Sequence, residues 1–154
     1  MKKIDIKKLL FYVGITVLIG SLPSFFIKID KVYKSINRPP LSPSGIVFPI
    51  VWTILFILMG ISIYLIVVSN SQKKKEAKLI YFVQLIINSL WTPIFFGLKE
   101  YFLAFLWILM LIVLVVTMII LFYKEKRLSA YLNLPYIAWL LFACYLNFGV
   151  FILN

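Results

Sequence analysis

Histidine is absent from this 154-residue sequence, and cysteine occurs once, at Cys144. Without histidine the chain cannot supply a histidine general base, a His-ligated zinc site or a proximal ligand for haem. A single cysteine excludes an intrachain disulfide and a cysteine-based metal cluster. We therefore expect no metal site and no required cofactor.

Charge is also scarce, since 14% of the residues are charged and 64% are apolar. A soluble domain averages about 25% charged and about 45 to 50% apolar residues. The charges fall in clusters that leave five apolar stretches, each close to the roughly 20 residues that a helix needs to cross about 30 Å of hydrocarbon. These stretches are residues 9–27, 46–68, 79–98, 101–123 and 132–153. We predict an all-α, integral membrane bundle of five transmembrane helices, with residues 1–154 as a single domain.

Two other interpretations fit the apolar stretches less well. Membrane strands alternate in polarity over about ten residues, whereas these stretches are apolar on all sides. The first stretch follows four lysines, as a signal-peptide core would. It is longer than such a core and no small-residue cleavage site follows it, so we expect it to be retained.

The net charge of +11 is best interpreted as a topology signal. Most of the Lys and Arg residues lie at the amino terminus, between the second and third stretches, and between the fourth and fifth. The others lie in residues 28–38 and at Lys99. The positive-inside rule then places the amino terminus in the cytoplasm and the carboxyl terminus outside the cell membrane. No soluble basic segment is interleaved with aromatics, so nucleic acid is not an expected partner.

The connection over residues 28–45 is the longest one. Pro39, Pro40, Pro43 and Gly45 indicate stiff, extended chain. The segment is either a plain interfacial linker or a lid, because long ordered loops beside a cavity often cover it.

Four further prolines fall within the apolar stretches. Pro49 and Pro135 lie where first helical turns are expected, and a missing N–H is harmless there. Pro23 and Pro93 lie further inside their stretches, so we expect them to kink the first and third helices.

Polar and aromatic side chains follow three of the expected helices. The stripes are Gln84, Asn88, Trp91 and Phe95; Tyr136, Trp139, Ala143 and Asn147; and Trp52, Phe56 and Met59 beside Gly60. Each set shares one helical face. No stretch contains an acid or a base, which argues against a proton-coupled pump or a charged ion filter. Each stripe alone is also typical of ordinary helix packing.

The depths of the stripes favour a shared site. Trp52, Trp91 and Asn147 reach about the same level below the outer surface, under residues 28–45. Indole, phenol and amide groups together suit a flat aromatic ligand with a few polar edges. The basic side chains of the connection either meet carboxylates of such a ligand or snorkel toward lipid headgroups. These are Lys28, Lys31, Lys34 and Arg38.

Four segments of the sequence form a recognisable set: Arg38-Pro39; Phe48-Pro49-Ile50-Val51-Trp52-Thr53-Ile54-Leu55 through Met59-Gly60; Gln84-Leu85-Ile86-Ile87-Asn88-Ser89-Leu90-Trp91 with Phe95-Phe96; and Leu134-Pro135-Tyr136-Ile137-Ala138-Trp139-Leu140-Leu141-Phe142-Ala143 with Leu146-Asn147. They resemble the TspO/MBR family, also called tryptophan-rich sensory proteins or translocator proteins, which includes the peripheral-type benzodiazepine receptor. The resemblance covers essentially the whole chain and is to bacterial-type members.

This resemblance implies a five-helix bundle, often a homodimer, with a pocket capped by the first loop. Family members bind porphyrins such as protoporphyrin IX and synthetic isoquinoline-carboxamide or benzodiazepine ligands. The implied pocket residues are Trp52, Asn88, Trp91, Tyr136, Trp139, Ala143 and Asn147, to which we add Phe56 from the Trp52 stripe. Tyr33, Arg38 and Pro39 are assigned to the lid. Trp52 and Trp139 would be the indoles placed against the porphyrin.

The chain also departs from the family pattern. Val32, Leu41 and Ile46 stand where family members often have tryptophan, so the aromatic content of the loop is reduced. The cholesterol-recognition pattern of animal members needs a tyrosine and then a basic residue. Phe148 is followed by no Lys or Arg, so we do not expect sterol binding at that end.

Three functions remain open at this point. The first is porphyrin binding, with light- and oxygen-dependent degradation of bound protoporphyrin as a subsidiary expectation. No general base, metal or nucleophile is present for it, so Trp52 and Trp139 are the catalytic candidates, as redox-active neighbours. The second is transport or export of porphyrins or other planar amphiphiles, although no inverted repeat or intramembrane ion site is visible. The third is a ligand-responsive sensory regulator whose partner binds the basic cytoplasmic loops.

Overall fold

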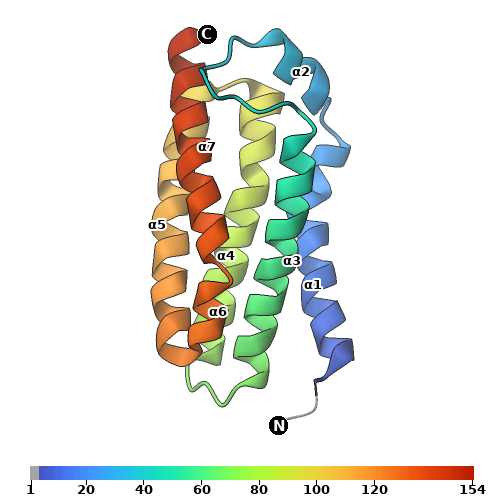
Figure 1. Ribbon diagram of the computed structural model, residues 1–154, viewed down its shortest axis with the longest axis vertical. Coiled ribbons are helices and arrows are strands. Elements are labelled where there is room, and N and C mark those ends of the chain that lie inside the picture. Colours follow the sequence, from blue (N-terminus) through green and yellow to red (C-terminus); the bar gives the residue numbers. More distant parts are fainter. Residues whose placement is uncertain (1–3) are drawn as a thin grey trace.

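The computed structural model describes residues 4–154, and over that range it contains helices and connections but no strand (Figure 1). Lys2 and Lys3, which count toward the basic amino terminus, lie outside the described residues. Five helical segments are long and apolar enough to cross a membrane: Ile6–Phe25, Val47–Val68, Lys74–Leu98, Tyr101–Glu125 and Arg127–Leu153. The predicted all-α membrane bundle with five spans is confirmed.

The first span consists of α1 (Ile6–Ser21) and a 3₁₀ turn, η1 (Leu22–Phe25). Its start is set by Asp5, whose carboxylate accepts the backbone N–H of Lys8 at 3.2 Å. This hydrogen bond keeps the pKa of the Asp5 carboxyl below its usual value. The expected range 9–27 is therefore wrong at both ends. Pro23 does not kink a continuous helix, because the α-helix ends before it and η1 contains it.

The connection over residues 28–45 contains a helix that its proline content does not predict. This helix, α2 (Ile29–Ser35), has Asp30 in its first turn and Lys34 in its last, which complements the helix dipole. The expectation of extended chain throughout is thus wrong. Regular helix is absent only from Ile36 to Ile46, where the prolines lie.

The second and third spans run close to their expected ranges. In α3 (Val47–Val68) Pro49 falls in the first turn, as predicted. The next helix, α4 (Lys74–Thr92), begins before the expected residue 79 because its charged first turn extends past the apolar stretch. It continues into a wide π-helical turn, η2 (Pro93–Leu98), where Pro93 has no N–H for the regular ladder. The chain reverses at Lys99, which has a φ of 58°.

The last two spans are α5 (Tyr101–Glu125), in agreement with 101–123, and a pair of helices in place of one. The pair is α6 (Arg127–Tyr131) and α7 (Leu134–Leu153). α7 therefore begins two residues after the predicted start at residue 132, and the separate helix α6 was not predicted. Pro135 lies in the first turn of α7, as predicted.

A buried polar cluster, formed by Ser62, Ser129 and Asn133 and called here the serine–asparagine cluster, connects α3 to the α6–α7 junction. The Asn133 side-chain amide donates to Ser62 Oγ at 2.6 Å and to the Ser129 carbonyl at 2.9 Å. Ser62 Oγ also donates to the Ser129 carbonyl at 2.8 Å. All three side chains are fully buried, so these bonds hold the two elements together in a place that water does not reach.

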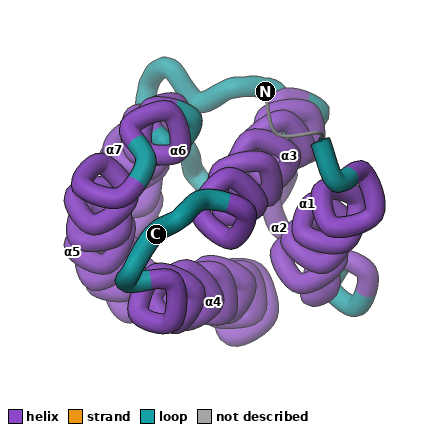
Figure 2. Tube along the Cα trace, turned by 90° about the horizontal axis from the view of Figure 1, so that it is seen from below, coloured by secondary structure: helices purple, strands orange, loops and turns teal. Residues whose placement is uncertain are grey.

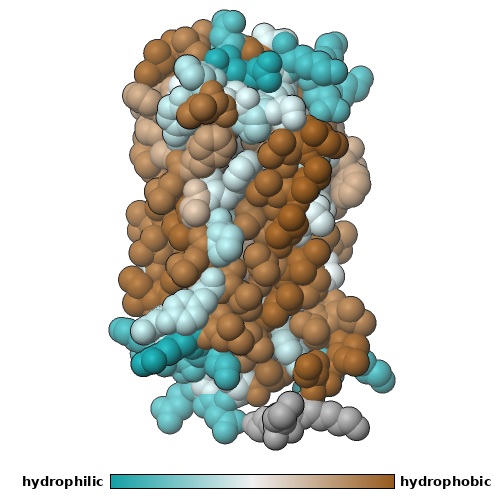
Figure 3. Space-filling model, in the orientation of Figure 1, coloured by the Kyte–Doolittle hydropathy of each residue, from teal (hydrophilic) through white to brown (hydrophobic). Residues whose placement is uncertain are grey.

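The helices are arranged around a common core. α1 packs on α3 and α4, while α5 packs on α4 and α7 (Figure 2). α3 meets α6 at the end that carries the serine–asparagine cluster, but it diverges from α7, and α4 is visible between the two in Figure 1. The connection over residues 28–45 crosses the opposite end of the bundle. Figure 3 shows an apolar belt between two hydrophilic ends, as a membrane span requires.

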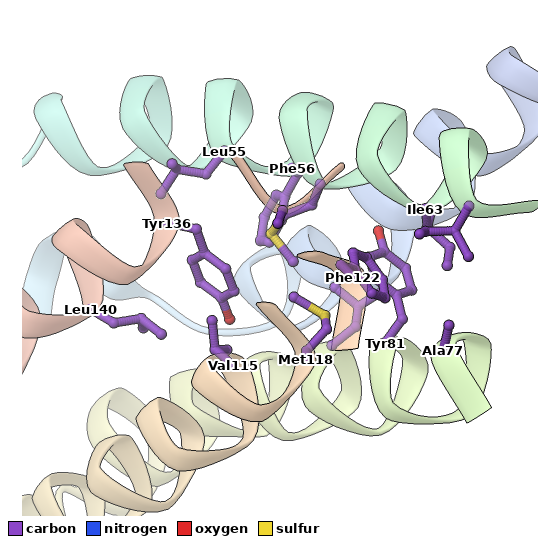
Figure 4. Packing of buried hydrophobic residues seen from close by; sticks show 14 of the residues in the cluster. Leu55, Phe56, Ile63, Ala77, Tyr81, Val115, Met118, Phe122, Tyr136 and Leu140 are labelled. Atoms are coloured by element: carbon purple, nitrogen blue, oxygen red, sulfur yellow. The ribbon is translucent and has the colours of Figure 1, made fainter. Parts of the chain in front are cut away.

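The core is filled by side chains from every major helix. Phe56 of α3, Met118 of α5 and Tyr136 of α7 point into one buried cluster (Figure 4). Between α1 and α3 the backbones approach closely at Gly60, where an added Cβ would lie 2.6 Å from Val13 Cα. Such close approach at small residues is a usual way for helices to pack in lipid.

Candidate functional site: an aromatic cavity under a lid

A cavity lies among α3, α4, η2 and α7, beneath the connection over residues 28–45. The space among its lining residues, which includes open solvent at its mouth, is about 600 Å³. The part that water can occupy is only about 40 Å³, because the lining side chains pack against one another. The lining includes six of the predicted ligand residues and two of the lid: Trp52, Asn88, Trp91, Trp139, Ala143, Asn147, Tyr33 and Arg38.

Three other predicted residues lie outside the lining. Phe56 stacks on Trp52 with ring centroids 5.3 Å apart, and Tyr136 meets Trp52 edge-on at 6.1 Å. Both therefore support the Trp52 indole from the core side. Pro39 packs against Gly149 of α7 instead of facing the cavity.

Most polar atoms of the cavity wall bond to one another. The Asn88 amide donates to the Tyr136 hydroxyl at 2.7 Å, and that hydroxyl donates to Gln84 Oε1 at 2.9 Å. Trp91 Nε1 donates to Asn147 Oδ1 at 3.0 Å. The expected amides thus brace the walls, which limits how many of their hydrogen bonds a ligand can take.

One buried donor on the wall has no partner within residues 4–154. Trp139 Nε1 is shielded from solvent and donates to no acceptor there, which is rare for a buried N–H. Trp139 lines the cavity, and its ring packs edge-on against Phe48 with centroids 5.9 Å apart. Within the described residues, the indole is therefore held by packing contacts and not by a hydrogen bond.

The lid presents a cation to the cavity. The Arg38 guanidinium lies 4.7 Å from the centre of the Tyr33 ring, and the Tyr33 hydroxyl donates to the Pro43 carbonyl at 2.5 Å. Among the described residues the one ion pair joins Asp5 to Lys8, so no carboxylate there neutralises Arg38. Lys28, Lys31 and Lys34 are not among the lining residues.

The lid is fastened to the far end of α7 by contacts that we call the lid latch. The Asn154 side chain accepts from the Asn37 backbone N–H at 2.9 Å and donates to the Asn37 carbonyl at 2.8 Å. The Tyr145 hydroxyl donates to the Pro40 carbonyl at 2.9 Å. Tyr33, Arg38 and Ser42 of residues 28–45 thus contribute to the cavity wall while the same segment is bonded to α7.

Sequence reasoning missed some of the lining. Phe48 of α3, Phe96 of η2 and Ser42 of the lid face the cavity without having been singled out as ligand residues. Phe48 lies one helical turn before Trp52, so the spacing of four residues was the available signal. Phe96 belongs to a segment that resembles the family, but its orientation depends on the wide turn after Pro93, which the sequence pattern does not report.

The fold and the cavity define a class: a five-span membrane protein with an aromatic, lid-covered site. The chain belongs to the TspO/MBR family, whose model matches residues 12–153. This confirms the resemblance noted in the sequence.

Curated relatives are similar to this chain in sequence over most of their length. The chain is 32% identical to a "Tryptophan-rich protein TspO" of Archaeoglobus fulgidus, covering 97% of this chain and 99% of the relative. It is 33% identical to a "Tryptophan-rich sensory protein" of Cereibacter sphaeroides, over 83% and 80% of the two chains. A "Translocator protein" of Ovis aries is 32% identical over 75% of this chain and 70% of the relative.

Proposed function

We propose that the cavity binds porphyrins such as protoporphyrin IX, and synthetic flat ligands of the benzodiazepine or isoquinoline type. The observation that carries this proposal is Arg38, a cation without a carboxylate partner among the described residues, on the wall of an otherwise uncharged cavity rich in aromatic rings. A flat ring suits the indole and phenyl walls, and a carboxylate on its edge suits the guanidinium.

A photochemical role is the second part of this proposal. In it, bound protoporphyrin absorbs light and is oxidised by O₂, and the protein holds the ring beside Trp52 and Trp139. Both indoles line the cavity, so each lies next to a ligand bound there. Among the described residues, the cavity lining includes no carboxylate, lysine, histidine or cysteine that would act as an acid, base or nucleophile.

The binding proposal is tested by titrating the protein in lipid nanodiscs with protoporphyrin IX in the dark. Replacing Arg38 by Gln should weaken protoporphyrin binding about tenfold, the low end of what a hydrogen bond to a charged group contributes. The dimethyl ester of the same porphyrin lacks the charge and should bind both proteins alike. Lys34→Gln, outside the cavity lining, is the matched control. Absence of binding to the wild-type protein would refute the proposal.

The photochemical part needs its own measurement. Under illumination in air, we expect Trp52→Phe and Trp139→Phe to lose photoproduct while dark binding is retained. Trp107→Phe is the control, because Trp107 donates to the Ile87 carbonyl and is not part of the lining. Undiminished photoproduct in both cavity variants would remove these indoles from the chemistry.

A further inference from the structure

The cavity is closed on two sides by contacts of different kinds. Toward the aqueous phase, the lid latch closes it with hydrogen bonds from Asn154 and Tyr145 and with the Pro39–Gly149 contact. Toward the hydrocarbon, it is closed where α3 and α7 diverge, which we call the α3–α7 seam. Only side chains bridge this seam near the cavity, because the two backbones do not pack together.

The bridging side chains are aromatic rings. Phe48 of α3 meets Trp139 of α7 edge-on at 5.9 Å, and Trp52 of α3 meets Tyr136 of α7 edge-on at 6.1 Å. Phe48, Trp52 and Trp139 are only partly buried. Figures 1 and 3 show the same face, where a band of intermediate hydropathy runs obliquely between more hydrophobic surfaces.

The seam faces lipid. Ile50 and Ile54 on α3 are 55% and 54% exposed, and Leu141 on α7 is 58% exposed. These residues lie within the candidate membrane spans. A ring that swings outward here enters hydrocarbon rather than water, so its displacement carries no hydrophobic penalty.

The two closures therefore resist opening unequally. Lifting the lid breaks the latch hydrogen bonds and exposes the apolar contact at Gly149 to water. Parting Phe48 from Trp139 breaks no hydrogen bond, because the Trp139 indole N–H donates to no acceptor within the described residues. It sacrifices the edge-to-face contact between Phe48 and Trp139 and, where the Phe48 ring itself moves, its edge-to-face contact with Tyr33 at 5.2 Å.

From these contacts we propose that ligands reach the cavity sideways from the bilayer through the α3–α7 seam, with Phe48 and Trp139 as the gate and the lid fastened. The proposal rests on the proposed function, since it concerns access to the same site. It also defines the ligand class: lipid-soluble planar molecules whose anionic edge stays near the membrane surface. Phe48 lies in the first turn of α3, so such a molecule would slide in beneath the lid with its charged edge toward Arg38.

The test compares three states of the lid in one protein. In a Cys144→Ser background, Asn37→Cys and Asn154→Cys together remove the Asn37–Asn154 hydrogen bonds of the latch and leave the Tyr145–Pro40 bond in place. A short bis-maleimide then joins the two thiols and fixes the lid. In nanodiscs, stopped-flow quenching of tryptophan fluorescence measures the association rate of protoporphyrin IX for the background protein, the unlinked variant and the cross-linked variant. We expect the three rates to agree within about twofold.

A faster rate in the unlinked variant together with a tenfold slower rate in the cross-linked one would overturn the proposal and place access under the lid. Such a result would leave porphyrin binding itself intact. Failure of the background protein to bind porphyrin at equilibrium would instead overturn the proposed function and this inference with it.

The gate itself is tested by Phe48→Ala, which should raise the association rate several-fold. Phe48→Leu should give a smaller increase and guards against loss of folding. The control is Phe102→Ala, which removes a ring that pairs with Phe151 between α5 and α7, away from the seam. Equal rates for wild type, Phe48→Ala and Phe48→Leu would count against the gate.

Discussion

Gly149 is the point where the lid comes closest to α7. A Cβ at this position would lie 2.5 Å from the ring of Pro39, so Gly149→Ala must displace the proline or the helix. We expect a loosened lid, and several-fold faster tryptic cleavage at Lys31 or Lys34 in detergent. Gly14→Ala is the control, because nothing lies within 4 Å of its added methyl. Equal cleavage of both variants would show that the lid does not depend on this contact.

Tyr136 links the buried polar side chains of Asn88 and Gln84 through its hydroxyl group. Tyr136→Phe removes the donor to Gln84 Oε1, and the Gln84 amide nitrogen already has no partner among the described residues. Leaving such a group unsatisfied costs about 1 to 3 kcal/mol, so we expect a lower melting temperature in detergent. Tyr131→Phe, at a half-exposed side chain, should melt like the wild type. An unchanged melting temperature for Tyr136→Phe would mean that water replaces the hydroxyl.

At the scale of elements, the α1–α3 crossing depends on Gly60. A methyl group there would meet the Val13 backbone, which cannot rotate away as a side chain can. Gly60→Ala should therefore separate the helices and lower the free energy of unfolding by about 1 to 3 kcal/mol, the usual effect of overpacking. Denaturation in mixed micelles measures it. Gly97→Ala, whose nearest neighbours lie at 3.9 Å, should change stability far less.

The elements also show which parts of the fold can be predicted from sequence. Long apolar stretches are decisive, so α3 and α5 match their expected ranges within two residues. Helix ends are set by local bonds that hydropathy does not report, such as the Asp5 cap of α1. α2 is short and charged. Its sequence signal is Asp30 in the first turn and Lys34 in the last, and the prolines that follow favour the opposite prediction of extended chain.

The candidate site follows the same division. Stripes at helical spacing bring Trp52, Asn88 and Trp139 to one cavity, because three long helices fix their faces. Periodicity alone does not distinguish residues that line the cavity from residues that pack behind the lining. It therefore places Phe56 and Tyr136 among the ligand residues, whereas in the structure both pack behind Trp52. The contact of Pro39 with Gly149 joins residues far apart in sequence, and no local pattern predicts it.

At the scale of the whole molecule, the distribution of Lys and Arg predicts an orientation. The basic ends beside α4 and α6 should face the cytoplasm, and the lid should face outward. In a Cys144→Ser background, Lys31→Cys should react with a membrane-impermeant maleimide in intact cells, whereas Lys75→Cys should react only after lysis. Both side chains are exposed, so accessibility of the residue itself does not decide the outcome. The opposite labelling pattern would reverse the assigned topology.

The serine–asparagine cluster gives the bundle a pivot. Since Ser62 is hydrogen-bonded to Ser129 and Asn133, α3 is fixed to the start of α7 at one end of the bundle, and the two helices diverge from there. Phe48 lies fourteen residues from Ser62 along α3, roughly 21 Å away, so a tilt of about 6° at the pivot moves the ring by roughly 2 Å. Small rotations at a fixed polar hinge thus become large openings at the opposite end. The proposed opening of the α3–α7 seam is therefore compatible with a hydrogen-bonded contact at the other end of α3.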